Sequence, residues 1–266
     1  MATAEKPEAR ALRERQRVLF DCVADLYAES RQPYPAAIVR WMAEMAGLAG
    51  WARVLEIGCG TGQLTRRLAQ LPIQLTAIDL GPAMVERARA EVRDPAVRFE
   101  ACSFEDFKAS PRSFDLIVCG TAFHWLDPDV AWSKPADLLA PGGWLAILFV
   151  GERYDEPLRS RIRSAWSSRT PGWSQAKSPT WADRMAASGR FTDIKERLHE
   201  ERVSLAPGTV LGVERTRATY LSFDDPTQRS FADELERALD RCTGVPAVIE
   251  TVATMGRVGP IAAIKP

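Results

Sequence analysis

The sequence predicts an α/β protein in which helices cover both faces of a doubly wound, mostly parallel sheet. Three observations support this fold class. Between residues 53 and 150, short apolar segments alternate with helical patterns, as in successive βαβ units. Segments such as LIVC and LAILFV are almost continuously apolar, which is typical of parallel strands buried on both faces. A glycine-rich loop follows the first apolar segment, where such sheets place their ligands.

The N-terminal part predicts two helices. Residues 8–29 carry apolar side chains spaced for one helical face, and Pro33 and Pro35 end that pattern. A second helix is expected to begin near Pro35 and to end at Gly47. Residues 1–50 are therefore predicted to form a helical cap.

The core is predicted over residues 51–150 and contains five strands. Their expected ranges are 53–57, 73–79, 97–102, 114–120 and 144–150. Helical patterns follow in the stretches 64–71, 84–88 and 129–139, and a turn at Pro141-Gly142-Gly143 is expected before the fifth strand.

Residues 151–266 are less regular and predict a helical insertion, or lid, plus the last strands of the same sheet within one overall domain. Arg, Ser, Pro and Trp dominate 151–180. Expected further on are a helix at 181–189, a long strand at 191–205, helices at 207–221 and 227–242, and a strand within 245–264. One of Trp166, Trp173 and Trp181 is expected to line an apolar substrate pocket.

Composition excludes several classes of protein. Lys and Arg together number 35, as do Asp and Glu, and the formal net charge of zero disfavours a nucleic-acid partner. The sequence has no apolar run of membrane-spanning length and no signal-peptide core, so we expect no membrane partner and a cytoplasmic location. Five scattered cysteines without CxxC spacing favour reduced thiols and no metal site. The oligomeric state is left open.

The segment Glu56-Ile57-Gly58-Cys59-Gly60-Thr61-Gly62 is the most informative. Alternating glycines allow the backbone to turn sharply and to approach a ligand closely. An ordinary βα turn would not need three of them. A nicotinamide dinucleotide site requires a glycine at the position that Gln63 occupies, so the spacing favours a single-nucleoside ligand. Asp79 ends the second strand, where its carboxylate can accept hydrogen bonds from ribose hydroxyls.

Five motifs in order across residues 53–150 resemble those of class I S-adenosylmethionine-dependent methyltransferases. They are VLEIGCGTGQLT, AIDLGPAMVERAR, SFEDF, FDLIVCGTAFHWLD and LLAPGGWLAI. The FHW loop, with Tyr27, Arg31, Tyr34 and Pro35 upstream, is similar to a small-molecule branch that includes trans-aconitate methyltransferase-like proteins. The resemblance implies a Rossmann-like sheet of about seven strands, the last antiparallel, and S-adenosyl-L-methionine as cofactor with S-adenosyl-L-homocysteine as product.

The resemblance also implies a cofactor site, in which the glycine loop surrounds the methionine part and Asp79 holds the ribose. The residues implied are Glu56, Gly58, Cys59, Gly60, Gly62, Asp79, Leu80, Ser103, Phe104, Tyr27 and Arg31. Glu56 would fix the loop from beneath, Leu80 would flank the adenine, and Phe104 would address it through its backbone N–H. Many relatives have Asp where this chain has Ser103, whose hydroxyl is a weaker acceptor.

Methyl transfer requires an aligned nucleophile, exclusion of water and, for a protonated acceptor, a base. His124 follows the fourth strand between Phe123 and Trp125, and we expect it to act as a base or to orient the substrate; a pocket-wall role is the alternative. Tyr34, Phe123 and Trp125 are expected to contact the substrate. His199 lies in a charged run and is expected at the surface. Arg31 is equally consistent with binding a carboxylate or with a surface ion pair.

The sequence thus predicts an enzyme that methylates a small organic molecule at oxygen, nitrogen or carbon by in-line displacement. An alternative is a protein of the same fold that uses the bound cofactor without methyl transfer, in a pericyclic rearrangement or a decarboxylation. A nicotinamide-dependent oxidoreductase is less favoured by the glycine spacing.

Overall fold

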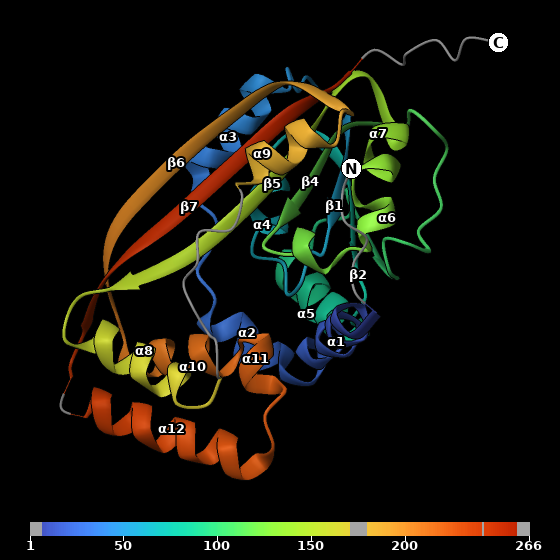
Figure 1. Ribbon diagram of the computed structural model, residues 1–266. Helices are drawn as coiled ribbons and strands as arrows, with labels where there is room; N and C mark the ends of the chain where they lie inside the picture. Colours follow the sequence, from blue (N-terminus) through green and yellow to red (C-terminus); the bar gives the residue numbers. More distant parts are fainter. Residues whose placement is uncertain (1–6, 171–179, 241, 260–266) are drawn as a thin grey trace. The chain divides into compact units, whose positions relative to one another are not determined.

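The computed structural model describes residues 7–170, 180–240 and 242–259, and it contains one seven-stranded sheet. The strands are β1 (Ala52–Ile57), β2 (Ile73–Asp79), β3 (Val97–Ala101), β4 (Phe114–Gly120), β5 (Leu139–Tyr154), β6 (Phe191–Leu205) and β7 (Val245–Val258). Their order across the sheet is β3-β2-β1-β4-β5-β7-β6 (Figure 1). The predicted fold class is confirmed.

The register of the parallel strands brings several strand ends to one edge. β1 pairs in parallel with β2 and β4, and Ile57 lies opposite both Ile78 and Cys119. β3 and β5 extend this parallel arrangement outward. β7 runs antiparallel to β5 (Figure 1), and the N–H of Asp155, just past β5, donates to the carbonyl of Pro246 at the start of β7. Consequently the loops after β1, β2 and β4 begin side by side.

The helices follow the predicted order, with some subdivided. They are α1 (Pro7–Arg17), the 3-10 helix η1 (Leu19–Val23), α2 (Ala24–Ser30), α3 (Ala36–Met45), α4 (Thr65–Leu68), α5 (Pro82–Val92), the 3-10 helix η2 (Phe123–Trp125), α6 (Pro128–Ala131), α7 (Ser133–Leu138), α8 (Leu158–Ser167), α9 (Trp181–Ala187), α10 (Pro207–Arg215), α11 (Ala218–Leu221) and α12 (Asp225–Leu239). None of these is long and apolar enough to cross a membrane.

Four expectations need correction. The helix expected over 8–29 is α1, η1 and α2, because the chain tightens into a 3-10 turn at Leu19–Val23. The helix expected over 129–139 is interrupted at Trp132, which lies between α6 and α7. The Pro141–Gly143 turn lies inside a longer β5, since Gly142 adopts φ +80° and the pairing with β4 shifts register there. The helix expected over 207–221 is divided into α10 and α11, because the chain leaves the helix at Thr216 and Arg217.

The chain divides into two compact units. The first comprises Met1–Gln32, Val150–Ser178 and Glu200–Glu250, and the second Pro33–Phe149, Pro179–His199 and Thr251–Pro266. In the first unit, Trp166 and Phe231 belong to a buried apolar cluster with residues of α10, α12 and the ends of the long strands. In the second, strand residues such as Leu55, Ile117 and Leu145 are fully buried beneath the flanking helices.

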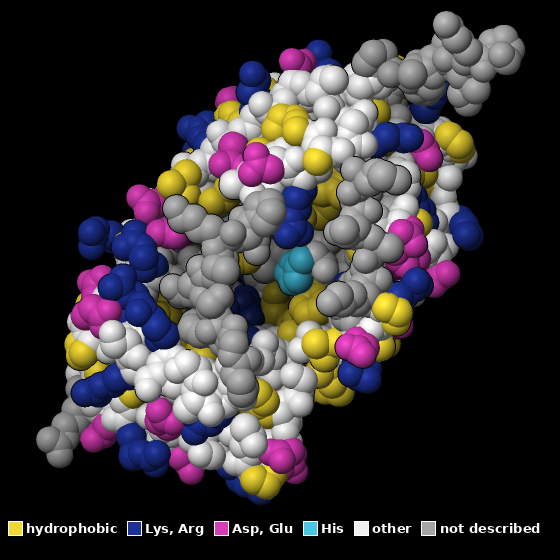
Figure 2. All heavy atoms as spheres, viewed as in Figure 1, with side chains coloured by type: hydrophobic (Ala, Val, Ile, Leu, Met, Phe, Trp, Pro, Cys, Tyr) yellow, Lys and Arg dark blue, Asp and Glu magenta, His cyan; other side chains and the backbone are white. Residues whose placement is uncertain are grey.

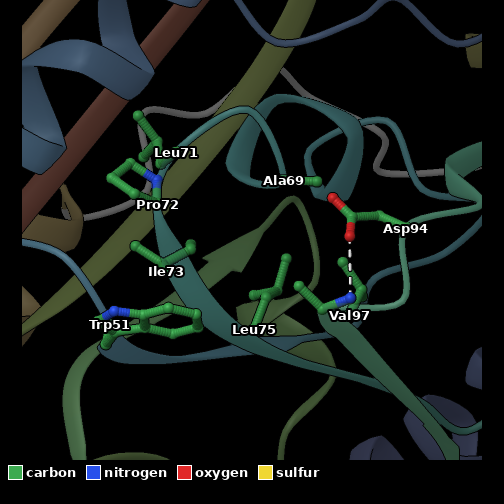
Figure 3. A pocket seen from close by; sticks show the side chains of 9 residues that line it. Trp51, Ala69, Leu71, Pro72, Ile73, Leu75, Asp94 and Val97 are labelled. Atoms are coloured by element: carbon green, nitrogen blue, oxygen red, sulfur yellow. Dashed lines mark hydrogen bonds between the residues drawn. The ribbon is translucent and has the colours of Figure 1, made fainter.

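A small apolar pocket opens at the amino ends of β1, β2 and β3 (Figure 3). It has a volume of about 180 Å³ and is lined mainly by apolar side chains, among them Trp51, Leu71 and Ile73. Trp51, which is 75% exposed, lies immediately before β1. The glycine loop follows the opposite end of β1, so this pocket is distinct from the predicted cofactor edge.

Candidate functional site

The loop between β1 and α4 has a backbone that depends on glycine. Gly58, Gly60 and Gly62 all have positive φ, at +70°, +53° and +92°. A Cβ built on Gly58 would lie 2.4 Å from the Cβ of Ala122, far inside van der Waals contact. The loop therefore packs directly against the segment that follows β4, and only glycine allows both this conformation and this approach.

Asp79 joins two loops at the carboxyl edge of the sheet. Its Oδ2 accepts a hydrogen bond from the N–H of Gly60 at 2.9 Å, and its Oδ1 accepts one from the N–H of Gly81 at 2.9 Å. The half-buried carboxylate thereby fixes the glycine loop relative to the start of α5. Leu80, also half-buried, follows directly in the chain. A negative charge is thus held between the two loops that follow β1 and β2.

Glu56 is a buried acid beneath this loop. Its side chain is 1% exposed, and its Oε2 has no hydrogen-bond partner among the described residues. Burial raises the pKa of Glu56 to about 8; the polar group of Thr65 opposes the shift, and the nearby Asp79 charge adds to it. The carboxyl is therefore mostly protonated at pH 7, and one polar atom remains available beneath the loop.

Cys59 supports the loop from within. Its side chain is buried, and its thiol donates a weak hydrogen bond to the carbonyl of Gly60 at 3.7 Å. Burial raises the pKa of the Cys59 thiol well above its ordinary value, and the Asp79 charge acts in the same direction. The side chain is accordingly an apolar packing group rather than a reactive thiolate.

The segment after β3 is held in place by Lys134. The Lys134 ammonium donates to the carbonyls of Phe104, Glu105 and Phe107, and it lies 4.9 Å from the centre of the Phe104 ring. The buried Ser103 hydroxyl donates to Asp106 Oδ2 at 2.7 Å and accepts from the Asp106 N–H at 3.0 Å. Ser103 thus shapes its own turn, and its adenine contact stays a prediction.

The FHW segment forms η2 directly after β4. Phe123 is buried, and its ring packs against the rings of Trp132 and Trp181, with centroids at 4.7 Å and 5.3 Å. His124 is exposed, and its ring lies 4.6 Å from that of the half-buried Trp125. Phe123 therefore anchors the turn, leaving the imidazole accessible.

The surroundings of His124 favour its neutral form. Crowding by protein atoms lowers the pKa of His124 to about 4, and the positive charge of Arg184 on α9 lowers it further. Much of the side chain still reaches solvent, but even a pKa at the ordinary value of about 6.5 leaves the ring mostly neutral at pH 7. A neutral imidazole offers one donor and one acceptor nitrogen to a neighbouring ligand.

Tyr34 lies at the same edge of the second unit. Its buried hydroxyl forms a 2.9 Å hydrogen bond with the hydroxyl of Thr121, and a Cβ on Gly120 would come within 2.5 Å of it. Thr121 has φ +54°, an unusual backbone conformation for a β-branched residue. The turn after β4 is therefore strained where it contacts Tyr34, whose substrate contact stays a prediction.

Two predicted cofactor residues belong to the first unit. The Arg31 guanidinium donates to the hydroxyl and the carbonyl of Thr216, both at 3.0 Å, and it lies 5.0 Å from the centre of the Tyr27 ring. Thr216 supplies neutral oxygens rather than a carboxylate. These contacts therefore favour neither of the two predicted roles of Arg31, which were binding the carboxylate of a ligand and forming a surface ion pair. The cofactor roles of Tyr27 and Arg31 stay predictions.

The remaining sequence candidates have different surroundings. Trp166 is 3% exposed, and its indole N–H donates to Glu214 at 2.8 Å, so it belongs to the core of the first unit. Trp181 contacts Phe123 and so lies beside η2. Trp173 lies outside the described residues. His199 is half-buried rather than exposed as expected.

Sequence reasoning missed three residues at this edge of the second unit. Lys134 lies about 30 positions from the segment it holds, and Thr121 meets Tyr34 across 87 positions. Arg184 affects His124 from a helix in the less regular part of the chain. A basic residue within a helix, such as Arg184, carries no feature in its local sequence that identifies the distant side chain it will affect. Among the described residues, no three His, Cys, Asp or Glu side chains gather as metal ligands would.

Comparison with known proteins agrees with this geometry. Residues 54–143 match the model of a family described as a methyltransferase domain. An uncharacterised methyltransferase of Mycobacterium tuberculosis is 30% identical over 130 residues, covering 49% of this chain and 51% of the relative. The ubiquinone biosynthesis O-methyltransferase of Xanthomonas euvesicatoria is 43% identical over 102 residues, covering 37% and 42%. The chain thus spans about half the length of the curated relatives it matches.

Solved structures share the fold. A candidate type II methyltransferase from Anaeromyxobacter dehalogenans superposes with a TM-score of 0.63 at 24% identity, covering 86% of this chain and 99% of that one. A Haemonchus contortus phosphoethanolamine N-methyltransferase, in complex with phosphomonomethylethanolamine and S-adenosylhomocysteine, gives 0.53 at 20% identity, covering 90% and 57%. The predicted resemblance to methyltransferases is confirmed: residues 54–143 match the methyltransferase domain family, and solved methyltransferase structures share the fold. The predicted small-molecule branch stays a prediction.

Proposed function

We propose that this protein is an S-adenosylmethionine-dependent methyltransferase acting on a small organic molecule. The observation that carries the proposal is the Asp79 carboxylate, which accepts hydrogen bonds from both Gly60 and Gly81 at the carboxyl edge of the sheet. A carboxylate in this place, between two backbone loops, suits a ligand with a vicinal diol such as a ribose. The methyltransferase names of the relatives support the same reading.

The residues around Asp79 fit such a cofactor. Gly58 keeps the loop against Ala122, so its backbone can approach a ligand without a Cβ in the way. The unpartnered Oε2 of Glu56 provides a polar atom beneath the loop. Phe104 and its backbone, fixed by Lys134, provide an apolar wall for a flat base. The glycine loop and Glu56 would hold the methionine part, Asp79 the ribose and Phe104 the adenine.

When bound, the cofactor supplies a methyl group that is already electrophilic on its sulfonium. What remains for the chain is to align the acceptor behind that methyl and to exclude water. The Phe123, Trp132 and Trp181 rings provide an apolar surface beside η2. A neutral His124 nitrogen can take a proton from the molecule that receives the methyl group, or it can orient that molecule by a hydrogen bond.

Asp79→Asn tests the cofactor site. We expect the Kd for S-adenosyl-L-homocysteine, measured by calorimetry, to rise about tenfold to a hundredfold, because the charge that aligns the two loops and meets the ribose is lost. Asp94→Asn is the matched control, since Asp94 also accepts from a backbone N–H, that of Ala96, but beyond the opposite end of the sheet. Wild-type protein that is folded and releases no heat with either cofactor form would refute the proposal.

His124→Gln tests the role of the imidazole. With an acceptor identified by a homocysteine-release screen, we expect kcat to fall about a hundredfold, the usual lower range for loss of a general base. The Kd for S-adenosyl-L-homocysteine should stay unchanged. His199→Gln, which changes the other histidine of the chain, should retain wild-type turnover. Near-normal turnover by His124→Gln would leave His124 as a wall of the pocket.

The same assay separates methyl transfer from non-reactive use of the cofactor. A methyltransferase forms one S-adenosyl-L-homocysteine for each product molecule, and chromatography quantifies both. Conversion of an acceptor without formation of S-adenosyl-L-homocysteine would favour the alternative in which the cofactor assists a rearrangement or a decarboxylation.

A further inference from the structure

The short helix α9 places aromatic and basic side chains next to η2 in the second unit. Its start is fixed by a capping box, in which the Thr180 hydroxyl accepts from the Asp183 N–H and the Asp183 carboxylate accepts from the Thr180 N–H. Trp181 then packs edge-on against Phe123. The cap and this contact hold the first turn of α9 in register with the FHW segment.

Arg184 lies on the same helix, with its guanidinium 5.0 Å from the centre of the Trp181 ring. The side chain is exposed, and within the described parts of the chain it makes no ion pair or side-chain hydrogen bond. Trp181, which lies under Arg184, contacts Phe123, the residue before His124, so Arg184 and His124 lie at the same edge, and the Arg184 charge lowers the pKa of His124. On the face drawn in Figure 2, basic and hydrophobic side chains gather around a histidine side chain (cyan).

Arg257 and Arg190, also of the second unit, differ from Arg184 in this respect, whereas Arg197 resembles it: its guanidinium lies 5.8 Å from the ring centre of Trp41 and has no carboxylate partner among the described residues. Arg197 belongs to β6, whereas Arg184 lies on the helix that packs against η2. Arg257 also lies over a tryptophan, 4.9 Å from the ring centre of Trp144, but it pairs with Asp193 at 3.6 Å. Arg190 pairs with Asp137. Arg184 is thus stacked like Arg257 but lacks the carboxylate that neutralises Arg257 on the surface.

A guanidinium placed over the face of an indole still has outward N–H groups that can donate to a ligand. Such a fork matches the two oxygens of a carboxylate or a phosphate, and stacking reduces the rotamer freedom lost on binding. An anion on Arg184 would lie beside His124, while the apolar part of the same molecule could rest against Trp181. The arrangement fits an acceptor with an apolar body and an anionic group.

We propose that Arg184 and Trp181 form a specificity subsite that binds an anionic group, carboxylate or phosphate, of the methyl acceptor. The inference rests on the proposed function, because it assigns the acceptor to the edge where η2 follows β4. Arg184 is here a substrate-binding residue, distinct from the loops that would hold the cofactor.

The test compares aromatic probes with and without an anionic group. Phenylacetate, its neutral amide phenylacetamide and phenyl phosphate are titrated calorimetrically into wild-type protein, with and without saturating S-adenosyl-L-homocysteine. We expect phenylacetate or phenyl phosphate to bind at least about tenfold more tightly than phenylacetamide. The tighter of the two anions identifies the group as carboxylate or phosphate.

Variants assign the preference to Arg184. In Arg184→Gln, the Kd values for the anions and for the amide should differ by no more than about twofold. Arg184→Lys should keep part of the preference for anions, and Arg257→Gln should keep the wild-type preference. Equal binding of anion and amide by wild type, absence of binding by both anions, or a full preference retained in Arg184→Gln would overturn the proposal. Heat released by S-adenosyl-L-homocysteine itself reports on the proposed function separately, and the probe titrations without it report on the subsite alone.

Discussion

Gly58→Ala is expected to weaken cofactor binding strongly while leaving most of the sheet intact. The substitution adds a Cβ at φ +70°, which costs about 1–2 kcal/mol for an L-residue. That Cβ would also lie 2.4 Å from the Cβ of Ala122. Either the glycine loop or the turn after β4 must move, and both would contact the ligand. We expect the Kd for S-adenosyl-L-homocysteine to rise at least about a hundredfold, as such displacements commonly cost.

Gly142→Ala separates backbone strain from steric clash. Gly142 has φ +80°, but a Cβ there would meet nothing within 4 Å. This variant should lose about 1–2 kcal/mol of unfolding free energy and bind S-adenosyl-L-homocysteine as wild type does. Gly58→Ala should lose more, about 2–5 kcal/mol, because overpacking adds to the strain. Unchanged cofactor affinity in a folded Gly58→Ala protein would show that the contact with Ala122 does not shape the site.

The parallel strands were predictable because each one is marked locally. The strands expected at 73–79 and 114–120 match β2 and β4 at both ends. Buried parallel strands are continuous apolar runs bounded by turns, so their ends are visible in the sequence. The glycine loop is equally local, since Gly58, Gly60 and Gly62 adopt the positive φ that their spacing suggested.

Contacts between distant segments were not predictable in this way. The hydrogen bond between Tyr34 and Thr121 and the charge of Arg184 beside His124 depend on which turn faces which helix. Likewise, Trp166 and Trp181 looked equivalent in sequence. One is buried in the core of the first unit, whereas the other packs on Phe123 in the second. Periodicity identifies an apolar face but not its partner.

The interruption of β5 shows the same limit within one strand. Pro141, Gly142 and Gly143 are residues that favour turns, so local sequence preference predicts that a strand ends there. In the structure, pairing with β4 continues on both sides of them: Leu139 lies opposite Phe114, and Trp144 lies opposite Leu116. Tertiary pairing thus outweighs local preference, and the extra residues are absorbed as an irregularity in the register.

Glu56→Gln is expected to change the pH dependence of stability more than any other single substitution of an acid. With the pKa of Glu56 raised to about 8, the folded protein binds one more proton than the unfolded chain between about pH 4.5 and pH 8. The free energy of unfolding of the wild type therefore falls as pH rises through this window, by up to about 1.4 kcal/mol per pH unit from this group. Below about pH 4.5 both states hold the proton, and the contribution is fully present.

Glutamine cannot ionise, so the free energy of unfolding of the variant does not fall with rising pH on account of residue 56. The difference in unfolding free energy, Glu56→Gln minus wild type, should rise steadily from pH 5 to pH 8 and become constant above it. Urea unfolding at a series of pH values measures this difference directly. Glu44→Gln, at an exposed helical position, is the matched control and should follow the wild-type profile. A difference independent of pH would mean that Glu56 is ionised in the folded protein, with a counter-charge or water satisfying its Oε2. In that case the buried acid would present a negative charge, rather than a hydrogen-bonding carboxyl group, to the underside of the glycine loop.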